Sequence, residues 1–254
     1  MGAFGCLRDS DDQTETRYCS THLFAAGDQV NFAGNFKKIG EIDVEPFKFL
    51  VNRLSDDHWL LDKERQARYE VHRQTQNIGL VYDYDFRHVK PTVQPPFSYF
   101  EPALMPIVET VATYYDNTAE GLELAKRYGQ GYCVRASLVR LMPGGSIAAH
   151  QDKNFSLNHS HRVHIPIITN PKVTFTVGAE TKHLREGEIV EINNRRMHSV
   201  ENASQESRIH LLIDWVIAGE PCCCATTVHP NELCNPQLCM ATDRLQVPCK
   251  CHPV

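Results

Sequence analysis

The residues with the clearest chemical potential stand in the second half of the chain. His150 and Asp152 are two positions apart, and His198 and then Arg208 follow them along the sequence. A His-x-Asp pair with a distant His is the ligand set that holds one face of an Fe(II) ion and leaves the other face open. The guanidinium of Arg208 adds a fixed positive charge suited to a co-substrate that bears a carboxylate. These residues predict an oxygenase site that uses iron, dioxygen and 2-oxoglutarate.

Strand geometry explains how this spacing brings the three ligands together. Side chains alternate between the two faces of a strand, so His150 and Asp152 point the same way. One inward-facing pair at the end of a strand can supply two ligands. His198 begins another predicted strand after the turn at Asn193-Asn194 and can supply the third.

Three further polar residues lie on neighbouring predicted strands: Arg162, His164 and Ser137. Arg162 and His164 alternate on an otherwise apolar strand, where an unpaired buried charge is costly. One interpretation is a structural salt bridge, and the other is that both residues hold the co-substrate or its metal-binding end. Ser137 could add a hydroxyl. The last predicted strand places Arg208 and His210 on one face, toward a polar cavity or solvent, and its apolar residues on the other.

Short alternating or apolar runs follow one another from residue 131 to residue 216. Turn residues such as Pro143-Gly144-Gly145 and Asn170-Pro171 separate them. About eight short strands at regular spacing argue for a β-sandwich or barrel. A double-stranded β-helix, or jelly roll, fits this number of strands and can hold a metal at its open mouth. The predicted fold is therefore mainly β, with a jelly-roll, cupin-like core and flanking helices.

The preceding part of the chain shows mixed patterns. Residues 45–75 carry apolar side chains at helical spacing, and residues 78–84 have the character of a strand. Residues 88–98 contain three prolines and indicate a loop. An apolar stripe over 101–127 predicts a long helix that breaks near Asn117 and continues as a shorter one.

The chain divides into four predicted parts by these changes in character. They are a disordered tail over 1–20, an α/β region over 21–130 that supports the core, the catalytic jelly roll over 131–218, and a Cys- and Pro-rich tail over 219–254.

Composition narrows the functional classes. The 254 residues are 42% hydrophobic and 22% charged, with a formal net charge of -5. Without a long Lys/Arg run, nucleic-acid binding by bulk electrostatics is disfavoured. The chain shows no apolar stretch of membrane-span length and no signal peptide, so we expect a cytoplasmic protein. Gly2 with Cys6 is a near match to an acylation signal, so membrane attachment through lipid anchors is the alternative to a plain tail. The oligomeric state is not readable.

Seven of the ten cysteines fall in the last predicted part. Without a signal peptide, free thiols or a metal site are favoured over disulfides. Cys234, Cys239, Cys249 and Cys251 could bind zinc, but their spacing matches no standard Cys-x2-Cys pair. An irregular tail of reduced thiols is the favoured interpretation.

Several segments between Arg135 and Val216 resemble the aspartyl/asparaginyl β-hydroxylase family of Fe(II)- and 2-oxoglutarate-dependent oxygenases, including its proline-hydroxylase-like bacterial members. The matching pieces, in order, are PGGSIAAHQD (143–152), RVHIPIITNP (162–171), FTVGAETKHLREGEIVEINN (175–194), HSVEN (198–202) and RIHLLIDWV (208–216). They cover about a third of the chain. They are specific for the family and uninformative about the substrate.

The resemblance implies a role for each matching polar residue. His150 and His198 would be iron ligands. Arg208 would pair with the far carboxylate of 2-oxoglutarate, while Arg162 and His164 would contact the co-substrate near the iron.

One position departs from part of the family. The human-type enzymes have a glycine where this chain has Asp152. We therefore expect a complete triad of two histidines and one carboxylate, which argues against a halogenase because that chemistry needs the position free for halide.

Two classes of function remain open at this point. The leading hypothesis is a dioxygenase that hydroxylates an unactivated C–H bond and releases succinate and CO2. Its substrate would be an amino-acid side chain, in a peptide, a protein or a free amino acid, or a small metabolite. The alternative is a non-catalytic jelly-roll module that senses a metal or 2-oxoglutarate, or that mediates an interaction.

Overall fold

The computed structural model describes residues 6–8, 17–19, 32–60, 73–83, 91–128, 130–152, 157 and 160–217. The predictions of acylation at Gly2 and of zinc binding within 219–254 lie outside these residues. In the predicted N-terminal tail, the structure has two short strands, β1 (Cys6–Arg8) and β2 (Arg17–Cys19), which pair with each other.

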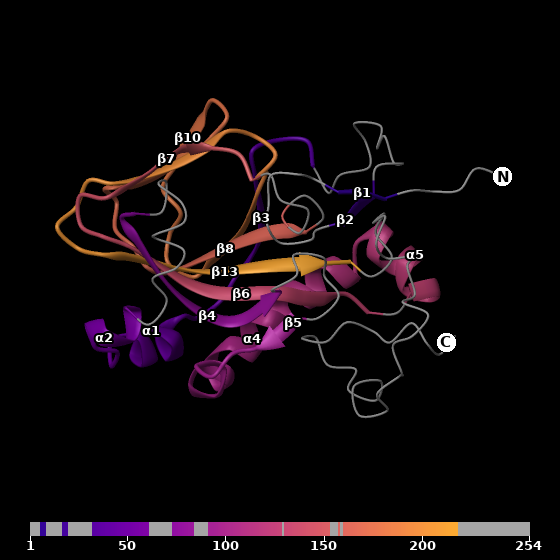
Figure 1. Ribbon diagram of the computed structural model, residues 1–254, viewed down its shortest axis with the longest axis horizontal. Coiled ribbons are helices and arrows are strands. Elements are labelled where there is room, and N and C mark those ends of the chain that lie inside the picture. Colours follow the sequence, from indigo (N-terminus) through magenta and orange to yellow (C-terminus); the bar gives the residue numbers. More distant parts are fainter. Residues whose placement is uncertain are drawn as a thin grey trace.

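Two antiparallel sheets lie face to face (Figure 1). The major sheet has the strand order β3-β11-β8-β13-β6-β4-β5, and the minor sheet has the order β10-β9-β12-β7. The major sheet contains β3 (Phe36–Glu41), β4 (Thr75–Asp83), β5 (Pro91–Val93), β6 (Tyr132–Leu141), β8 (His161–Ile168), β11 (Glu188–Ile192) and β13 (Arg208–Val216). The minor sheet contains β7 (Ser146–His150), β9 (Val173–Val177), β10 (Glu180–Lys182) and β12 (His198–Asn202).

The eight strands from β6 to β13 wind between the two sheets. The chain passes from β6 to β7, back to β8, across to the β9–β10 hairpin, back to β11, across to β12 and back to β13. This path is a double-stranded β-helix, so the predicted jelly-roll core and its number of strands are confirmed.

Helices cover the outer face of the major sheet (Figure 1). They are α1 (Glu45–Val51), α2 (Asp56–Trp59) and α4 (Phe97–Asp116), and α5 (Ala119–Tyr128) follows α4. The stripe of α4 that includes Leu104, Val108 and Val111 packs in one core cluster with Val163 and Ile165 of β8. The predicted break near Asn117 is confirmed, because Asn117 follows the last residue of α4.

One of the expectations for this region is wrong. The proline-rich segment 88–98 is not all loop, because Pro91–Val93 forms β5 and α4 begins at Phe97. Strand β5 is at the edge of the sheet, where the missing N–H of Pro91 is tolerated. The helical spacing predicted from residue 45 corresponds to two short helices, α1 and α2, and a Ser55 capping box starts the second.

Strands from the predicted supporting region complete the major sheet. Strand β4 pairs with β6, and β3 pairs with β11. Lys37 of β3 contacts the buried carboxylate of Glu191 at 2.8 Å, and Glu191 also contacts His161 at 2.8 Å. The sheet is therefore continuous across residue 131, and the division of the chain there stays a prediction.

Strand β13 shows how the two faces of the major sheet differ. Ile209, Leu211 and Ile213 join the core cluster under α4. Arg208 and Asp214, on the opposite face, are also buried. That face, here called the inner face, looks toward the minor sheet, and it carries the polar residues singled out in the sequence.

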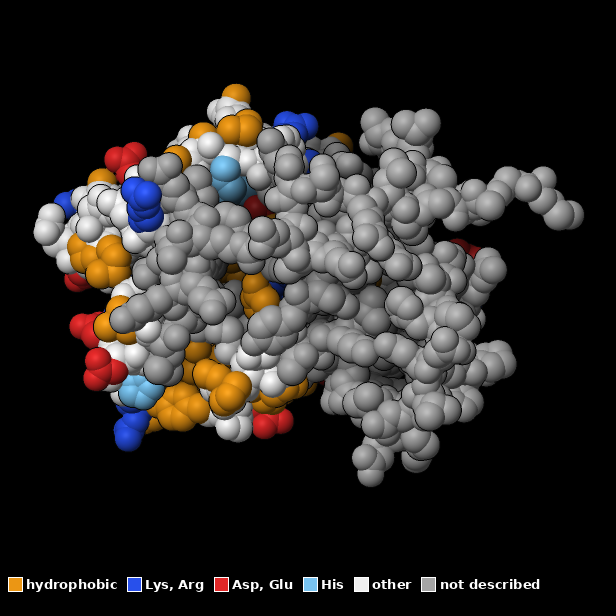
Figure 2. Space-filling model, viewed as in Figure 1, with side chains coloured by type: hydrophobic (Ala, Val, Ile, Leu, Met, Phe, Trp, Pro, Cys, Tyr) orange, Lys and Arg blue, Asp and Glu red, His pale blue; other side chains and the backbone are white. Residues whose placement is uncertain are grey.

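The described surface mixes charges of both signs. Figure 2 shows blue and red side chains interspersed with orange ones on the left part of the view. Among the described residues, no helix is both long enough and apolar enough to cross a membrane.

Candidate functional site

The structure brings His150, Asp152 and His198 together at one end of the space between the sheets. His150 is the last residue of β7 and His198 the first of β12, and the two are register partners. Their ring centroids are 4.2 Å apart. Asp152 follows two residues after β7. The three potential ligand atoms all lie within 4.8 Å of one another.

Backbone carbonyls select the nitrogen that each histidine presents. His150 Nδ1 donates to the carbonyl oxygen of Ala148 at 2.8 Å, and His198 Nδ1 donates to that of Arg196 at 3.0 Å. Each lone pair then resides on Nε2, and the two Nε2 atoms lie 3.9 and 4.0 Å from the Asp152 carboxylate. Burial lowers the pKa of His198, which favours the neutral form that binds metals. This donor set fits an Fe(II) ion.

Asp152 is held as a carboxylate by its neighbours. Arg162 Nη1 donates to Asp152 Oδ2 at 3.0 Å, and Asn194 Nδ2 lies 3.3 Å from the same oxygen. Burial opposes the charge, but the nearby Arg162 and the two histidines outweigh it and lower the pKa of Asp152. A ligand oxygen that is already ionised and oriented needs little rearrangement to bind a cation.

Arg162 itself lies in a buried ionic network. It contacts Asp214 through Nε and Nη2, both at 2.9 Å, and Asp214 also accepts from Arg135 Nη1 at 2.9 Å. Register pairing across β8, β13 and β6 sets these three side chains in one row. The salt-bridge interpretation of Arg162 matches these contacts. Its contact with a co-substrate stays a prediction.

A second polar group on the inner face contains a buried arginine that is not paired with a described carboxylate. Arg208 is 1% exposed, and its hydrogen bond goes from Nη2 to His210 Nδ1. Its Nε atom has no partner among the described residues, and no described carboxylate pairs with it. Burial lowers the pKa of Arg208 to about 9. Burying a cation without an anion costs free energy. A ligand that carries an anion would supply the partner that this guanidinium lacks.

His164 lies between the two polar groups. Its ring is 5.8 Å from that of His210 and 5.0 Å from that of Phe175, which in turn stacks 6.5 Å from His198. Neither ring nitrogen of His164 has a partner among the described residues. Burial, reinforced by the Arg208 charge, holds the pKa of His164 well below its usual value, so the ring is neutral.

Ser137 stands on β6 in the same inner-face row as His164. It pairs with Leu212 of β13, which pairs in turn with His164 of β8, and it is buried. The β13 member of this row, Leu212, is two residues from His210 and four from Arg208. The Ser137 hydroxyl therefore lies nearer to His164 than to Arg208.

Sequence reasoning missed the contacts of two residues. Asp214 was assigned no role, and it joins Arg162 to Arg135. Asn194 was assigned only to a turn, and it contacts Asp152 and the carbonyl oxygen of Leu157. A signal for Asp214 did exist, because a carboxylate and an arginine on two apolar strands each need an opposite charge.

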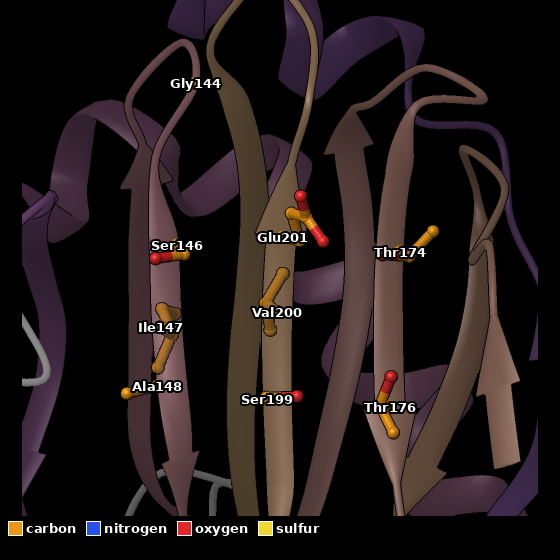
Figure 3. Close-up of a pocket in the computed structure, with 9 residues that line it drawn as sticks. All are labelled: Gly144, Ser146, Ile147, Ala148, Thr174, Thr176, Ser199, Val200 and Glu201. Carbon is orange, nitrogen blue, oxygen red and sulfur yellow. The ribbon is translucent and has the colours of Figure 1, made fainter.

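A shallow hollow on the outer face of the minor sheet is separate from this site. Figure 3 shows it with short side chains spread over β7, β9 and β12. It is lined by Gly144, Ser146, Ile147, Ala148, Thr174, Thr176, Ser199, Val200 and Glu201. With Glu201 as its one ionisable lining residue, it offers no ligand cluster of the kind on the inner face.

Comparisons with solved structures give distant likenesses. An oxidoreductase of the 2OG-Fe(II) oxygenase family from Burkholderia pseudomallei is 12% identical, over 71% of this chain and 94% of that chain, with a TM-score of 0.45. The viral collagen prolyl hydroxylase of Paramecium Bursaria Chlorella virus-1, solved with 2OG, is 7% identical, over 73% of this chain and 98% of that chain, with a TM-score of 0.43. A cupin domain from Bordetella pertussis is 22% identical, over 32% of this chain and 79% of that chain, with a TM-score of 0.26. No curated protein matches the chain.

A family model gives the more specific result. Residues 115–217 match the model described as aspartyl/asparaginyl beta-hydroxylase. The matched segment runs from the last turn of α4 through the end of β13, so it includes both polar groups of the inner face. This segment, about two fifths of the chain, is therefore similar to the aspartyl/asparaginyl beta-hydroxylase family of enzymes.

Proposed function

We propose that this protein is an Fe(II)- and 2-oxoglutarate-dependent dioxygenase. It hydroxylates an unactivated C–H bond of an amino-acid side chain, in a peptide or a free amino acid, or of a small metabolite. The observation that carries the proposal is the pairing of a His-Asp-His cluster with the fully buried Arg208, which has no described anionic partner. The metal-binding residues, from β7, β12 and the residues just after β7, and Arg208, on β13 of the major sheet, then lie on the two sides of the space between the sheets. The cytoplasmic location stays part of the proposal.

Three side chains would hold the metal. His150 and His198 present Nε2, and Asp152 presents a carboxylate oxygen, which together would occupy one face of the ion. When bound, iron and 2-oxoglutarate supply the oxidation, dividing the two oxygen atoms of O2 between succinate and the hydroxylated product. The protein orients the reactants and keeps bulk water out.

The two polar groups have separate tasks in this scheme. Arg162 keeps Asp152 ionised and in place, since its Nη1 donates directly to that carboxylate. Arg208 would bind the distal carboxylate of the co-substrate through a charge-assisted hydrogen bond. His164 is neutral, and one ring nitrogen must carry a proton, so it adds an N–H donor between them.

An anaerobic titration tests the proposal directly. The Fe(II)-loaded protein is mixed with 2-oxoglutarate, and the weak metal-to-ligand charge-transfer band in the visible range is followed. We expect the band in the wild type and in Arg185→Ala, whose arginine is exposed and pairs with Glu188 at the surface. We expect a much weaker band in Arg208→Ala. Iron that binds without any band in the wild type would contradict the proposal.

Succinate formation separates an enzyme from a binding module. We expect the wild type to convert 2-oxoglutarate slowly to succinate in air, even without a substrate, because such oxygenases turn over uncoupled. A protein that shows the band but never forms succinate over a broad substrate panel would be a sensor instead.

A further inference from the structure

The guanidinium of Arg208 depends on a single protein partner. Its one side-chain hydrogen bond among the described residues goes to His210 Nδ1. On the inner face, Leu141 of β6 stands opposite Arg208, while Val139 of β6 and Pro166 of β8 stand on either side of His210. Apolar neighbours cannot fix the rotation of a guanidinium by hydrogen bonding, so His210 is what orients it.

The protonation state of His210 follows from its surroundings. The ring is 1% exposed, and burial with the adjacent Arg208 charge holds its pKa well below the usual value. The neutral ring has one acceptor nitrogen and one donor nitrogen. Because Arg208 has only donors, Nδ1 must be the acceptor, and the proton resides on Nε2.

The combined group is rich in donors and lacks an acid. It contains Arg208 Nε, His210 Nε2 and the nitrogens of His164, all buried and without a partner among the described residues. A site of this kind suits one carboxylate, and its selectivity depends on how the guanidinium is turned.

We propose that His210 is a positioning residue for co-substrate recognition: its Nδ1 fixes the Arg208 guanidinium in the orientation that receives the distal carboxylate of 2-oxoglutarate. This inference rests on the proposed function, since it names how the same site selects its co-substrate. The role is specific to the distal end, because the contact between His210 and Arg208 involves none of the three residues that would hold the metal.

Two probes distinguish this role from a general structural one. 2-Oxoglutarate has a distal carboxylate, whereas oxalate chelates a metal without one. Dissociation constants for both are measured on the Fe(II)-loaded wild type and on His210→Phe, which keeps the ring shape and loses both nitrogens. We expect His210→Phe to bind 2-oxoglutarate about tenfold more weakly and oxalate as tightly as the wild type.

Two polar variants keep the test independent of folding. His210→Asn places an amide near the Nδ1 position and can accept from Arg208, so we expect affinity for 2-oxoglutarate close to that of the wild type. His210→Gln reaches toward the Nε2 position instead, and we expect it to bind as weakly as His210→Phe. His58→Phe, at an exposed position of α2, is the matched control and should bind both probes normally.

Each contrary result has a distinct meaning. If the wild type binds oxalate but not 2-oxoglutarate, the proposed function fails. If the wild type binds 2-oxoglutarate and His210→Phe binds it equally well, the function stands and the role of His210 is overturned. Equal weakening of both probes, or an Asn variant as weak as the Gln variant, would also overturn the positioning role.

Discussion

The space between the two sheets holds two buried polar groups that differ in their balance of charge. In the first, here the balanced group, Asp152 and Asp214 pair with Arg162 and Arg135. In the second, here the unbalanced group, Arg208 bonds to the neutral His210, the neutral His164 lies near His210, and no described carboxylate pairs with Arg208. The balanced group satisfies its own charges and shapes a ligand, whereas the unbalanced group needs an anion from outside. Buried charge without a partner is thus a better guide to a binding site here than buried charge as such.

The largest effect is expected where the balanced group meets the metal. His198→Ala removes one of the three clustered ligands, and we expect iron binding to weaken more than about a hundredfold, since loss of even an outer partner of a ligand costs 10–100-fold. Metal content after dialysis and succinate formation measure this. His183→Ala, in a half-buried loop position, is the control. Unchanged iron content in both His150→Ala and His198→Ala would remove the metal assignment.

The next largest effect is expected within the balanced group. Asp214→Ala leaves Arg162 and Arg135 without the carboxylate that accepts hydrogen bonds from both, and we expect the free energy of unfolding to fall by about 4 kcal/mol. Urea denaturation of the metal-free protein measures it. Asp56→Ala breaks an exposed pair with Arg140, and the expected change there is about 1 kcal/mol or less. Similar losses in both variants would mean that the buried network contributes no more than a surface pair.

The unbalanced group should respond in the opposite direction. Arg208→Met removes a charge that has no described counter-ion, so we expect the metal-free protein to gain about 1 kcal/mol in its free energy of unfolding. Arg162→Met, in the balanced group, should lower the same quantity because it leaves Asp214 and Asp152 with less compensation. Denaturation curves of both variants and the wild type, recorded without co-substrate, measure these changes in the free energy of unfolding. Arg208→Met as destabilising as Arg162→Met would show that the two groups do not differ.

As the pH falls, the histidines of the unbalanced group should reduce the stability of the fold before the carboxylates of the balanced group do. The folded pKa values of His164 and His210 are well below 6.5, so the unfolded chain takes up protons below pH 6.5 that the folded chain cannot hold, and stability falls as pH falls. Asp152 and Asp214 have lowered pKa values, so their contribution is lost only below the usual value of 3.8. From pH 6.5 to 5.5 we expect His164→Phe to lose about 1 kcal/mol less stability than the wild type. Denaturation at both pH values tests this, and equal losses would count against it.

The sequence predicted the strand-borne part of the site because strands have a fixed period. The alternation that puts Arg208 and His210 on the inner face of β13 needs no knowledge of distant contacts. Asp152 lies beyond the end of β7, so strand alternation does not explain its place beside His150. The break of the long helix near Asn117 was equally local. What could not be predicted was register, since it depends on which strands become neighbours. Asp214 stands opposite Arg162 only because β13 lies beside β8 with that alignment. The loop predicted at 88–98 was wrong for a similar reason, because an edge position in a sheet permits a proline that local rules exclude.

The pairing of β3 with β11 and of β4 with β6 has a practical consequence for anyone who expresses a shortened protein. A fragment that begins at residue 115 or 131 would leave the long sides of β6 and β11 open, with their backbone groups free to pair with other copies. It would also remove Lys37 and leave the buried Glu191 with His161 alone. We expect such a fragment to aggregate, and a shortened protein that stays in solution should begin ahead of Phe36.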